Sequence, residues 1–374
     1  MPQVQVISTG SYLPGEPLTN ADLERLVGPL PEDILEGIQV KQRHWMIDPD
    51  TGEHRISNSE MATAAVREAL ETAELEPGQV ELIVSSTASP DYHLPPLVTL
   101  VQEQLGIAKC ATTEIRSGCA GFVEAFEVAR MYLERGTYNT AVVVGSEAIS
   151  PLLAPVYLGK DPERIRMRDR MNPYNFGDGA GAVVLQTNGD NGEGIIGGAI
   201  SSVGGERPAA MQVIGGSTHA PIHKQLEAKL LVELKVDVVA SGEVTPHVLT
   251  EALTDVLRAS NVAAEDIDVC VIPEGNAGYM VEELKAAGLL TPEWLALEGK
   301  IIENLTEVGA TGSAAVPLAL DDAWKKDRLK RGDKVMVLAI ETSKWKYAGA
   351  VLNWTAAPYQ GAAARAGAEQ TAKA

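Results

Sequence analysis

The sequence predicts an α/β protein whose chain is built from two similar halves. Residues 69–84 and residues 256–271 follow one plan: the end of an amphipathic helix, a short acidic turn and then an apolar strand. Leu70 of the first copy matches Leu257 of the second. Both strands lack polar alternation, which is typical of strands in a sheet that is covered on both faces.

The order of elements repeats further along the chain. An Arg-Gly pair precedes the apolar run at residues 141–144, and another precedes the run at residues 335–338. A helix, strand, helix, strand order in each half predicts two similar α/β units. We therefore expect an N-terminal half over residues 1–186, a C-terminal half over residues 187–358, and a flexible tail over residues 359–374, where the sequence becomes Ala-rich.

The composition predicts a large folded protein with an acidic surface. The chain has 374 residues, of which 45% are hydrophobic, enough for a large core. Acidic residues outnumber basic ones by 51 to 31, which gives a formal net charge of -20. Such a surface repels nucleic-acid phosphates and anionic membranes, so we expect neither as a partner. The sequence has no run of about 18 apolar residues and no secretory signal pattern, which favours a cytoplasmic protein.

Cys119 is the candidate nucleophile. Cys110, Cys119 and Cys270 have no CxxC pairing and no histidine at metal-ligand spacing, so we expect free thiols and no metal site. Small residues at positions 117–121 open an apolar helix. Partial positive charge at a helix start lowers the pKa of a thiol, and neighbouring N–H groups stabilise an oxyanion. The alternative is a cysteine that packs as a small core residue.

Residues 118–122, Gly-Cys-Ala-Gly-Phe, resemble the nucleophile motif of ketoacyl synthase III enzymes (beta-ketoacyl-ACP synthase III) of the thiolase superfamily. Further landmarks keep the family's order, at residues 10–14, 86–92, 175–182 and 348–354. The resemblance implies a thiolase fold, in which duplicated αβαβα halves form a five-layered core, and an acyl group carried on Cys119. It also implies a homodimer, with the apolar strand at residues 140–145 as the edge that pairs across the two-fold axis.

The chain departs from this family at the two side chains that assist decarboxylative condensation. Glu274 stands in the place of the family's histidine, and Ala310 stands in the place of its asparagine. Both lost side chains donate hydrogen bonds, which an ionised carboxylate and an alanine cannot do. We therefore expect acyl transfer without malonyl decarboxylation, with Glu274 as general base and Asn276 as a replacement donor. The alternative is that Glu274 only caps a polar pocket.

Ser343 falls where the family supplies a backbone N–H to the oxyanion hole from a glycine-rich loop. A backbone donor survives the change of side chain if serine tolerates the local backbone angles. Of the histidines, four lie in segments that can approach a cleft and replace the lost base: His93, His219, His223 and His247. Residues 177–181 resemble a dinucleotide fingerprint, but they lead into a strand rather than a helix, which predicts a structural turn.

The acyl donor is expected to be a carrier-protein thioester. The family's coenzyme A users hold the adenine shortly before a Gly-Ile pair, and the residues before Gly37-Ile38 in this chain lack that clamp. An acidic carrier protein needs a basic patch. The candidate patch comprises Arg164, Arg166, Arg168 and Arg170. A second basic run lies at residues 325–331, and either run can instead be a solvated face.

The sequence therefore predicts an acyltransferase of polyketide or fatty-acid-related metabolism. It loads an acyl group from a carrier-protein or CoA thioester onto Cys119 and passes it to a second substrate. No permanently bound cofactor is expected, and the acyl-phosphopantetheine thioester is a substrate. Two alternatives stay open: a ketosynthase that forms a carbon-carbon bond with a rearranged triad, and a non-catalytic partner of a homologous subunit in a heteromeric synthase.

Overall fold

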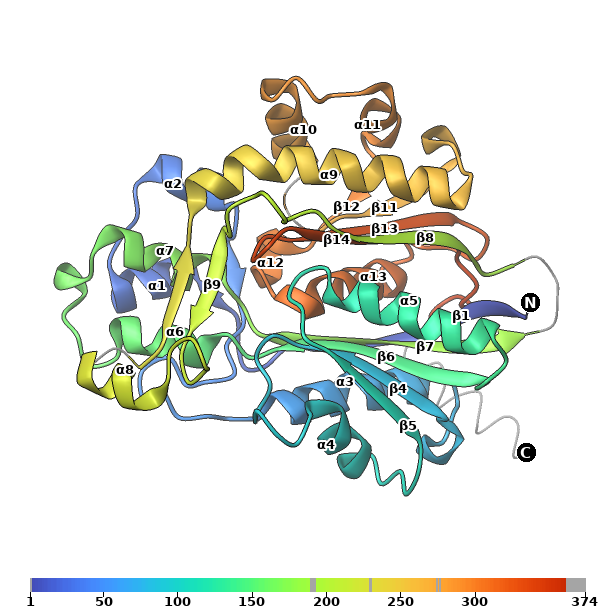
Figure 1. Ribbon diagram of the computed structural model, residues 1–374, viewed down its shortest axis with the longest axis horizontal. Helices are drawn as coiled ribbons and strands as arrows, with labels where there is room; N and C mark the ends of the chain where they lie inside the picture. The colour runs from blue at the N-terminus through green and yellow to red at the C-terminus, as the bar shows by residue number, and fades with distance from the viewer. Residues whose placement is uncertain (1, 189–192, 229–230, 274, 276, 361–374) are drawn as a thin grey trace.

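The computed structural model describes residues 2–188, 193–228, 231–273, 275 and 277–360, and over these residues the fold has five layers (Figure 1). Two five-stranded sheets in this part of the chain lie on either side of a central helical layer, and further helices cover their outer faces. The first sheet has the order β1-β7-β6-β4-β5. Its strands are β1 (Gln3–Tyr12), β4 (Leu82–Ser86), β5 (Ala111–Ile115), β6 (Thr140–Glu147) and β7 (Gly179–Asn188).

The second sheet repeats the first. Its order, β8-β14-β13-β11-β12, matches strand for strand, with two antiparallel pairings followed by two parallel pairings in both sheets. Leu82 pairs with Ala141 in the first sheet, and Val269 pairs with Val335 in the second. Its strands are β8 (Ile195–Ser202), β11 (Val269–Val271), β12 (Ile301–Ile302), β13 (Lys334–Glu341) and β14 (Lys346–Asn353). The predicted duplication and thiolase-type layering are confirmed.

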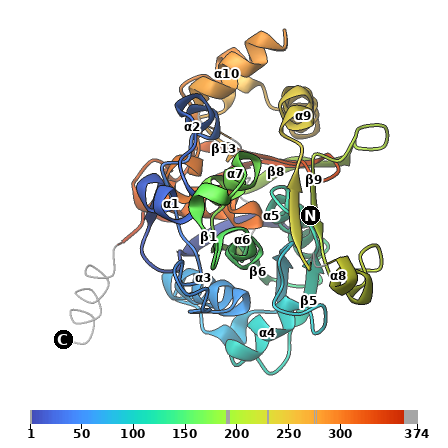
Figure 2. The ribbon, with the colours of Figure 1, turned by 90° about the vertical axis from the view of Figure 1, so that its left-hand side faces the viewer.

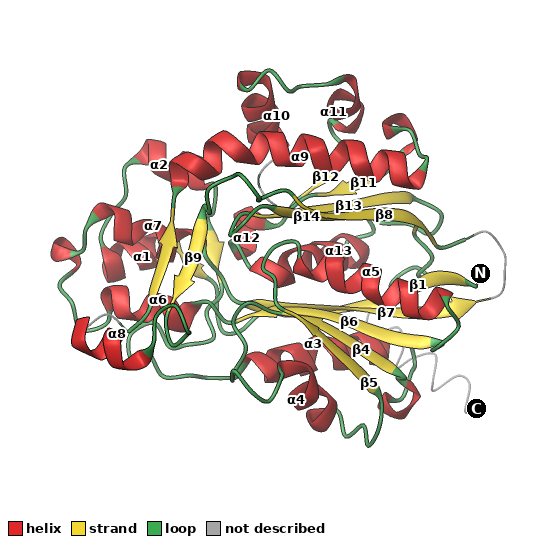
Figure 3. Ribbon diagram, viewed as in Figure 1, coloured by secondary structure: helices red, strands yellow, loops and turns green. Residues whose placement is uncertain are grey.

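The helices divide into buried and covering ones (Figure 3). Helices α5 (Gly121–Glu134) and α13 (Ala315–Lys325) lie between the sheets, and their buried residues include small and apolar side chains around most of each helix. Because most residues of both helices are buried, the carboxylates of Glu124, Glu127 and Asp321 among them, each helix is packed on nearly all sides. The covering helices are α3 (Asn58–Thr72) and α4 (Leu97–Gln104) on the first sheet, and α9 (Val238–Ser260), α10 (Ala277–Ala286) and α11 (Pro292–Leu297) on the second.

A polar network fastens the two halves together. Asp321 of α13 is buried and accepts hydrogen bonds from the hydroxyls of Thr9 and Ser11 in β1, at 2.7 and 2.6 Å. The ammonium group of Lys325 lies 2.7 Å from Asp321 and 2.7 Å from Glu68 of α3. The buried carboxylate is therefore paired and hydrogen-bonded, as burial of a charge requires.

A cap of short elements covers one end of the sheets, and Figure 2 faces it. Its elements are β2 (Leu18–Thr19), α1 (Asn20–Val27), α2 (Glu32–Ile38), β3 (Gln42–Arg43), α6 (Ser150–Tyr157), α7 (Met167–Asn175), β9 (Met211–Ile214), α8 (Ile222–Ala228), β10 (Glu233–Val236) and α12 (Leu305–Val308). Arg43 is buried within the cap and donates to Leu18 O, Asn20 Oδ1 and Tyr174 O at 3.0, 2.7 and 2.6 Å. Burial lowers the pKa of Arg43 to about 10.

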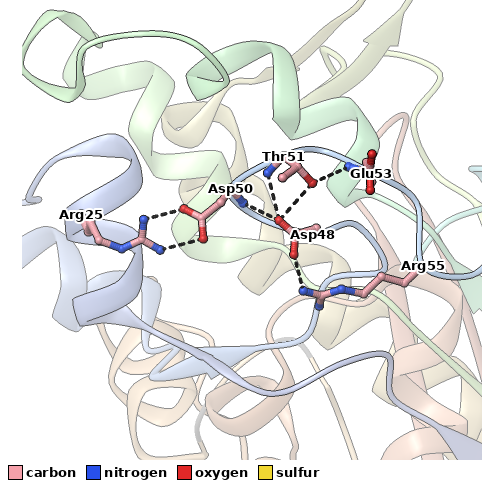
Figure 4. Close-up of polar contacts among 6 residues, drawn as sticks. All are labelled: Arg25, Asp48, Asp50, Thr51, Glu53 and Arg55. Carbon is pink, nitrogen blue, oxygen red and sulfur yellow. Dashed lines mark hydrogen bonds and ion pairs between the residues drawn. The ribbon is translucent and has the colours of Figure 1, made fainter.

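The loop that follows β3 is closed by Asp48 (Figure 4). Its Oδ1 accepts from the backbone N–H groups of Asp50 and Thr51 at 3.0 and 2.9 Å, and its Oδ2 accepts from Arg55 at 2.8 Å. The bond from the backbone of Thr51, followed by that from Arg55, lowers the pKa of Asp48 to about 2. Asp50 in turn pairs with Arg25 at 2.6 Å, which ties the loop to α1.

The prediction that residues 140–145 form a sheet edge is wrong. They belong to β6, which is hydrogen-bonded to β4 on one side and to β7 on the other. An apolar strand without alternation suits a central position as well as a covered edge, and here the central position applies. Among the described strands, β5 pairs with β4 alone and forms the edge of the first sheet. Residues 361–374 of the predicted tail lie outside the described residues.

Candidate active site

Cys119 lies in a turn between β5 and α5. The N-cap of α5 is Ala120, so the predicted position of the cysteine at a helix start is confirmed. The Gly121 N–H donates to Gly118 O at 2.7 Å and closes the turn. A Cβ on Gly121 would lie 2.0 Å from the hydroxyl of Ser86 in β4. The second glycine of the motif is therefore required by close packing of the turn on the first sheet.

Ser313 braces this turn from the other half of the chain. It lies in the short 3-10 helix Gly312–Ala314, and its hydroxyl is 2.9 Å from Ser117 O and 3.0 Å from Gly118 O. The hydroxyl of Ser86 lies 3.1 Å from the hydroxyl oxygen of Ser313. Sequence reasoning missed this role, although Ser313 lies three residues after Ala310 in the segment that matched a family motif.

Glu147 of β6 is a buried acidic residue that contacts the backbone N–H of Ser313. It accepts from Ala88 N at 2.9 Å, from Ser313 N at 3.4 Å and from the hydroxyl of Ser89. Burial raises the pKa of Glu147 to about 7, against the opposing effect of these hydrogen bonds. Gly312 has a φ of 52°, and a Cβ on it would lie 2.8 Å from Glu147 Cγ. The carboxylate therefore fixes the backbone that carries Ser313.

Cys119 lines a cavity of about 460 Å³ between the two halves and the cap. The described lining includes no Lys, Arg or His, and its one carboxyl group belongs to Glu283, whose pKa is raised by burial. The cavity therefore suits a neutral chain with apolar and amide groups. Its described lining comprises Ile34, Gly37, Ile38, Gln39, Cys119, Met171, Asn172, Asn175, Phe176, Met211, Val236, Val238, Ser241, Gly242, Thr245, Pro273, Tyr279, Glu283, Leu305, Ala310, Thr311, Gly312, Ala315 and Thr342.

The predicted site residues have different outcomes. Glu274 and Asn276 lie outside the described residues, although Pro273 next to them lines the cavity. Ala310 also lines the cavity, so the position matched to the family's asparagine faces the site without a hydrogen-bonding side chain. None of the histidines lies among the described lining residues, so none is positioned there as a replacement base.

The backbone N–H of Ser343, the predicted oxyanion donor, is already engaged. It donates to Oε1 of Glu341 at 2.8 Å. Glu341 is 2% exposed, and a Cβ on Gly118 would lie 2.2 Å from its Oε2. Glu341 lies two residues before Ser343, and no pattern in the sequence indicated a role for it. Its approach to the cysteine turn depends on a contact between the two halves, which local pattern does not reveal.

Residues 177–181 do not form the predicted turn: Gly177 and Asp178 connect to β7, and residues 179–181 are already its first residues. The prediction that a strand and not a helix follows is confirmed. Asp178 is buried and accepts from the backbone N–H groups of Met46, Ile149 and Ser150 at 2.7, 2.6 and 2.9 Å. Burial raises the pKa of Asp178 to about 6. The carboxylate thus joins three segments of the first half and is not available to a nucleotide.

The four arginines of the candidate docking patch differ in their surroundings. Arg170 donates to three carbonyl oxygens, Ile165 O, Pro29 O and Pro162 O, and so braces the cap. The side chains of Arg164, Arg166 and Arg168 are 87%, 67% and 71% exposed. They lie at and just before the start of α7, whose Met171, Asn172 and Asn175 line the cavity.

The second basic run is largely paired with acidic residues. Lys325 contacts Asp321 and Glu68, and both Lys326 and Arg328 contact Asp322 at 2.7 and 2.6 Å. Arg331 pairs with Glu193 at 3.0 Å. The arginines near α7 are paired as well, Arg164 with Asp161 at 3.6 Å and Arg166 and Arg168 with Asp169 at 2.6 and 3.6 Å, so what distinguishes that run is its position beside a helix that lines the cavity.

The described residues contain neither a metal-binding cluster nor a membrane-spanning helix. No group of three or more His, Cys, Asp or Glu side chains there is arranged to hold a metal ion. No helix in that part of the chain is long and apolar enough to cross a bilayer. No disulfide joins the three cysteines.

Comparison with known proteins matches both halves of the chain to one enzyme family. Residues 113–204 match 3-oxoacyl-acyl-carrier-protein (ACP) synthase III, and residues 257–354 match its C-terminal region. The beta-ketoacyl-ACP synthase III of Caldanaerobacter subterraneus subsp. tengcongensis is 30% identical over 350 residues, which cover 94% of this chain and 97% of the relative.

Solved structures agree in fold over nearly the whole chain. A structure described as AbyA1, a tetronic acid condensing enzyme, superposes with a TM-score of 0.79 at 27% identity and covers 94% of this chain and 99% of its own. The 3-oxoacyl-ACP synthase III of Aquifex aeolicus VF5 has a TM-score of 0.74 at 26% identity, with 94% and 100% covered. Because both halves match and the Caldanaerobacter relative is 30% identical over nearly its whole length, the chain belongs to the 3-oxoacyl-ACP synthase III family of thiolase-fold enzymes.

Proposed function

We propose that this protein is an acyltransferase that takes an acyl group from a phosphopantetheine thioester onto Cys119 and passes it to a second substrate. The observation that carries the proposal is the position of Cys119 on the cavity, in a turn that precedes α5 and is braced by Ser313. A helix start lowers the pKa of a thiol and so eases the loss of its proton as the sulfur attacks the thioester carbonyl. Membership of a ketoacyl synthase family supports the acyl-enzyme step.

The donor in this proposal is an acyl carrier protein, with no permanently bound cofactor. The described cavity lining carries no cation to hold the phosphates of coenzyme A, whereas a phosphopantetheine arm is neutral beyond its single phosphate. Gly37 and Ile38, the pair that lacks the adenine clamp, line this cavity. Arg164, Arg166 and Arg168 form the docking patch for the acidic carrier. The relatives that carry acyl carrier protein in their names support this choice, and a cytoplasmic location belongs to the same proposal.

The second half-reaction transfers the acyl group to an acceptor that arrives without a carboxylate to lose. Ala310 leaves the cavity without the amide that helps malonyl decarboxylation. Glu274 acts on the acceptor as general base, and Asn276 donates to the carbonyl oxygen; both roles rest on the match to family motifs. The products are an acylated acceptor and the free Cys119 thiol.

Condensation is the second candidate function, and one observation favours it. AbyA1, which shares 27% identity and 94% coverage of this chain, is described as a tetronic acid condensing enzyme. In that case, the acceptor is a carbon nucleophile, and the product contains a new carbon-carbon bond. The acylation of Cys119 is common to both candidates, and the acceptor atom distinguishes them.

A homodimer is the proposed assembly. β5 ends four residues before Cys119 and has one side that is not paired within the described chain. Pairing of this edge with a second copy would extend the sheet and satisfy its backbone groups. A homologous but different chain at the same edge would instead make a heteromeric synthase.

Intact-protein mass spectrometry tests the proposal. Wild type and Cys119→Ala are incubated with acyl-ACP and acyl-CoA donors of several chain lengths. We expect an acyl mass gain in wild type alone, larger with ACP donors. A wild type that gains no mass but binds a homologous synthase would establish the partner-subunit alternative. Product masses after addition of hydroxyl, amine and carbon-acid acceptors then distinguish transfer from condensation.

A further inference from the structure

Glu341 is a buried carboxylate that packs against the nucleophile turn. It is the last residue of β13, and its side chain is 2% exposed. Its Oε1 accepts the N–H of Ser343 at 2.8 Å. Its Oε2 is buried and has no hydrogen-bond partner among the described residues. Burial of an unsatisfied carboxylate oxygen is costly, and such groups in folded proteins are associated with catalytic roles.

No cation of the described chain neutralises this carboxylate. Lys346 is opposite Glu341 in the β13–β14 pairing, but its ammonium group lies 2.6 Å from Glu124 of α5. The unpaired oxygen of Glu341 instead faces the backbone of Gly118. A Cβ on Gly118 would lie 2.2 Å from Oε2 and 3.2 Å from Cδ. Glycine at this position therefore makes room for the carboxylate beside the residue that precedes Cys119.

The other carboxylates around the turn are already occupied. Glu124 accepts from the hydroxyl of Ser117 at 3.1 Å and pairs with Lys346. Both oxygens of Glu147 accept hydrogen bonds, from Ala88 and from the hydroxyl of Ser89. Within the described residues around the turn, Glu341 is thus the carboxylate with an unused acceptor oxygen.

We infer that Glu341 accepts the proton of the Cys119 thiol when the acyl group is loaded; this inference rests on the proposed function. The bond from sulfur to the acyl carbon forms while the thiol proton moves to Oε2 of Glu341. The bond from the acyl carbon to the phosphopantetheine sulfur then breaks, and that sulfur takes the proton from Glu341. The carrier leaves as its thiol, Glu341 is again a carboxylate, and no other reactant is consumed.

Glu341→Gln separates proton transfer from positioning. The glutamine keeps a carbonyl oxygen for the N–H of Ser343, but it cannot accept the thiol proton. We expect single-turnover loading of Cys119 from acyl-ACP, followed by intact mass, to slow by about 100-fold, the effect of losing a general base. Alkylation of Cys119 by iodoacetamide should become faster, because loss of a neighbouring negative charge favours the thiolate that this reagent traps.

Glu127→Gln is the matched control. Glu127 is another buried carboxylate on the first half, paired with Arg130 at 2.7 Å, six residues after the turn in α5. This variant should load Cys119 at the wild-type rate. Loss of both loading and alkylation in Glu341→Gln would show a structural role and overturn the inference.

The inference and the proposed function fail in different ways. Equal loading by wild type and Glu341→Gln would overturn the inference and leave the acyl-enzyme intact. A wild type that alkylates at Cys119 but takes no acyl group from any donor would overturn both.

Discussion

The hydroxyl of Ser313, in the C-terminal half of the chain, lies 3.0 Å from the carbonyl oxygen of Gly118 in the N-terminal half. The same hydroxyl is 2.9 Å from Ser117 O. Two carbonyls of the turn that contains Cys119 are therefore oriented by one side chain of the opposite half. With these carbonyls turned toward Ser313, the backbone direction of the turn that presents Cys119 is fixed.

Ser313→Ala should weaken both folding and catalysis. The substitution leaves two buried carbonyls and the hydroxyl of Ser86 without this partner, which costs about 1–3 kcal/mol of unfolding free energy. We expect a lower urea midpoint together with slower acyl loading of Cys119. Ser260→Ala is the control, because that buried hydroxyl bonds to Val256 O of its own helix. Loading at an unchanged rate in Ser313→Ala would show that the turn holds its shape without the brace.

Gly118→Ala should be destabilising for a reason that a second substitution can remove. The added Cβ would lie 2.2 Å from Glu341 Oε2, and overpacking of this kind costs about 1–3 kcal/mol. Glu341→Ala takes away the opposing atoms. In a double-mutant cycle by urea unfolding, Gly118→Ala should therefore cost less in the Glu341→Ala background than in wild type. Additive effects would place the strain of Gly118→Ala elsewhere.

Much of the fold could be predicted because the signals are local. The helix, acidic turn and apolar strand of residues 69–84 recur at residues 256–271, and the matched strands β4 and β11 occupy equivalent places in the two sheets. Cys119 was found for a similar reason, since small residues before an apolar helix form a contiguous pattern.

The rest of the site depends on contacts that no local pattern carries. Ser313 and Gly118 are 195 residues apart, and neither has a neighbour in sequence that indicates the other. Glu341 stands at the end of an apolar strand, where a carboxylate normally marks the approach to solvent, yet it is buried against the other half. The edge of the first sheet was misplaced because apolar composition does not distinguish β6, paired on both sides, from an edge strand that is covered by a partner.

The stability of the protein should fall as the pH rises through the titration of Glu147. Its pKa is raised by burial from 4.5 to about 7, so the folded state holds a proton that the unfolded state releases. The stabilisation is therefore complete below about pH 4.5 and is lost as the pH approaches 7. Glu147→Gln mimics the protonated form and should reduce the difference in unfolding free energy between pH 5 and pH 7.5 by about 2 kcal/mol.

Urea unfolding at the two pH values measures this difference. Asp178 contributes a dependence of the same sign in both proteins, because its pKa is raised to about 6. Glu147→Gln should therefore retain part of the decrease in unfolding free energy between pH 5 and pH 7.5. If the unfolding free energy of Glu147→Gln decreased with pH as much as that of wild type, Glu147 would not hold its proton in the folded protein.

Reversal of the docking patch should weaken the use of carrier-bound donors specifically. Arg164, Arg166 and Arg168 are mostly exposed, and the helix that follows them lines the cavity, so a carrier bound at this patch would place its arm near the mouth. Changing all three to Glu should raise KM for acyl-ACP by about tenfold at low salt, because the patch would then repel an acidic carrier. Acyl loading from a short pantetheine thioester, which needs no protein docking, should be unchanged.

The matched control reverses charge on the other basic run. Lys326→Glu with Arg328→Glu adds negative charge in a run that contributes no residue to the described cavity lining, so KM for acyl-ACP should change little. The wild-type KM should also rise with salt, while that of the arginine variant should be nearly independent of salt, since screening acts on the attraction that the variant has lost. Equal effects of the two charge reversals would show that the carrier responds to net charge alone, and a selective loss in the arginine variant would place the donor's entry beside α7.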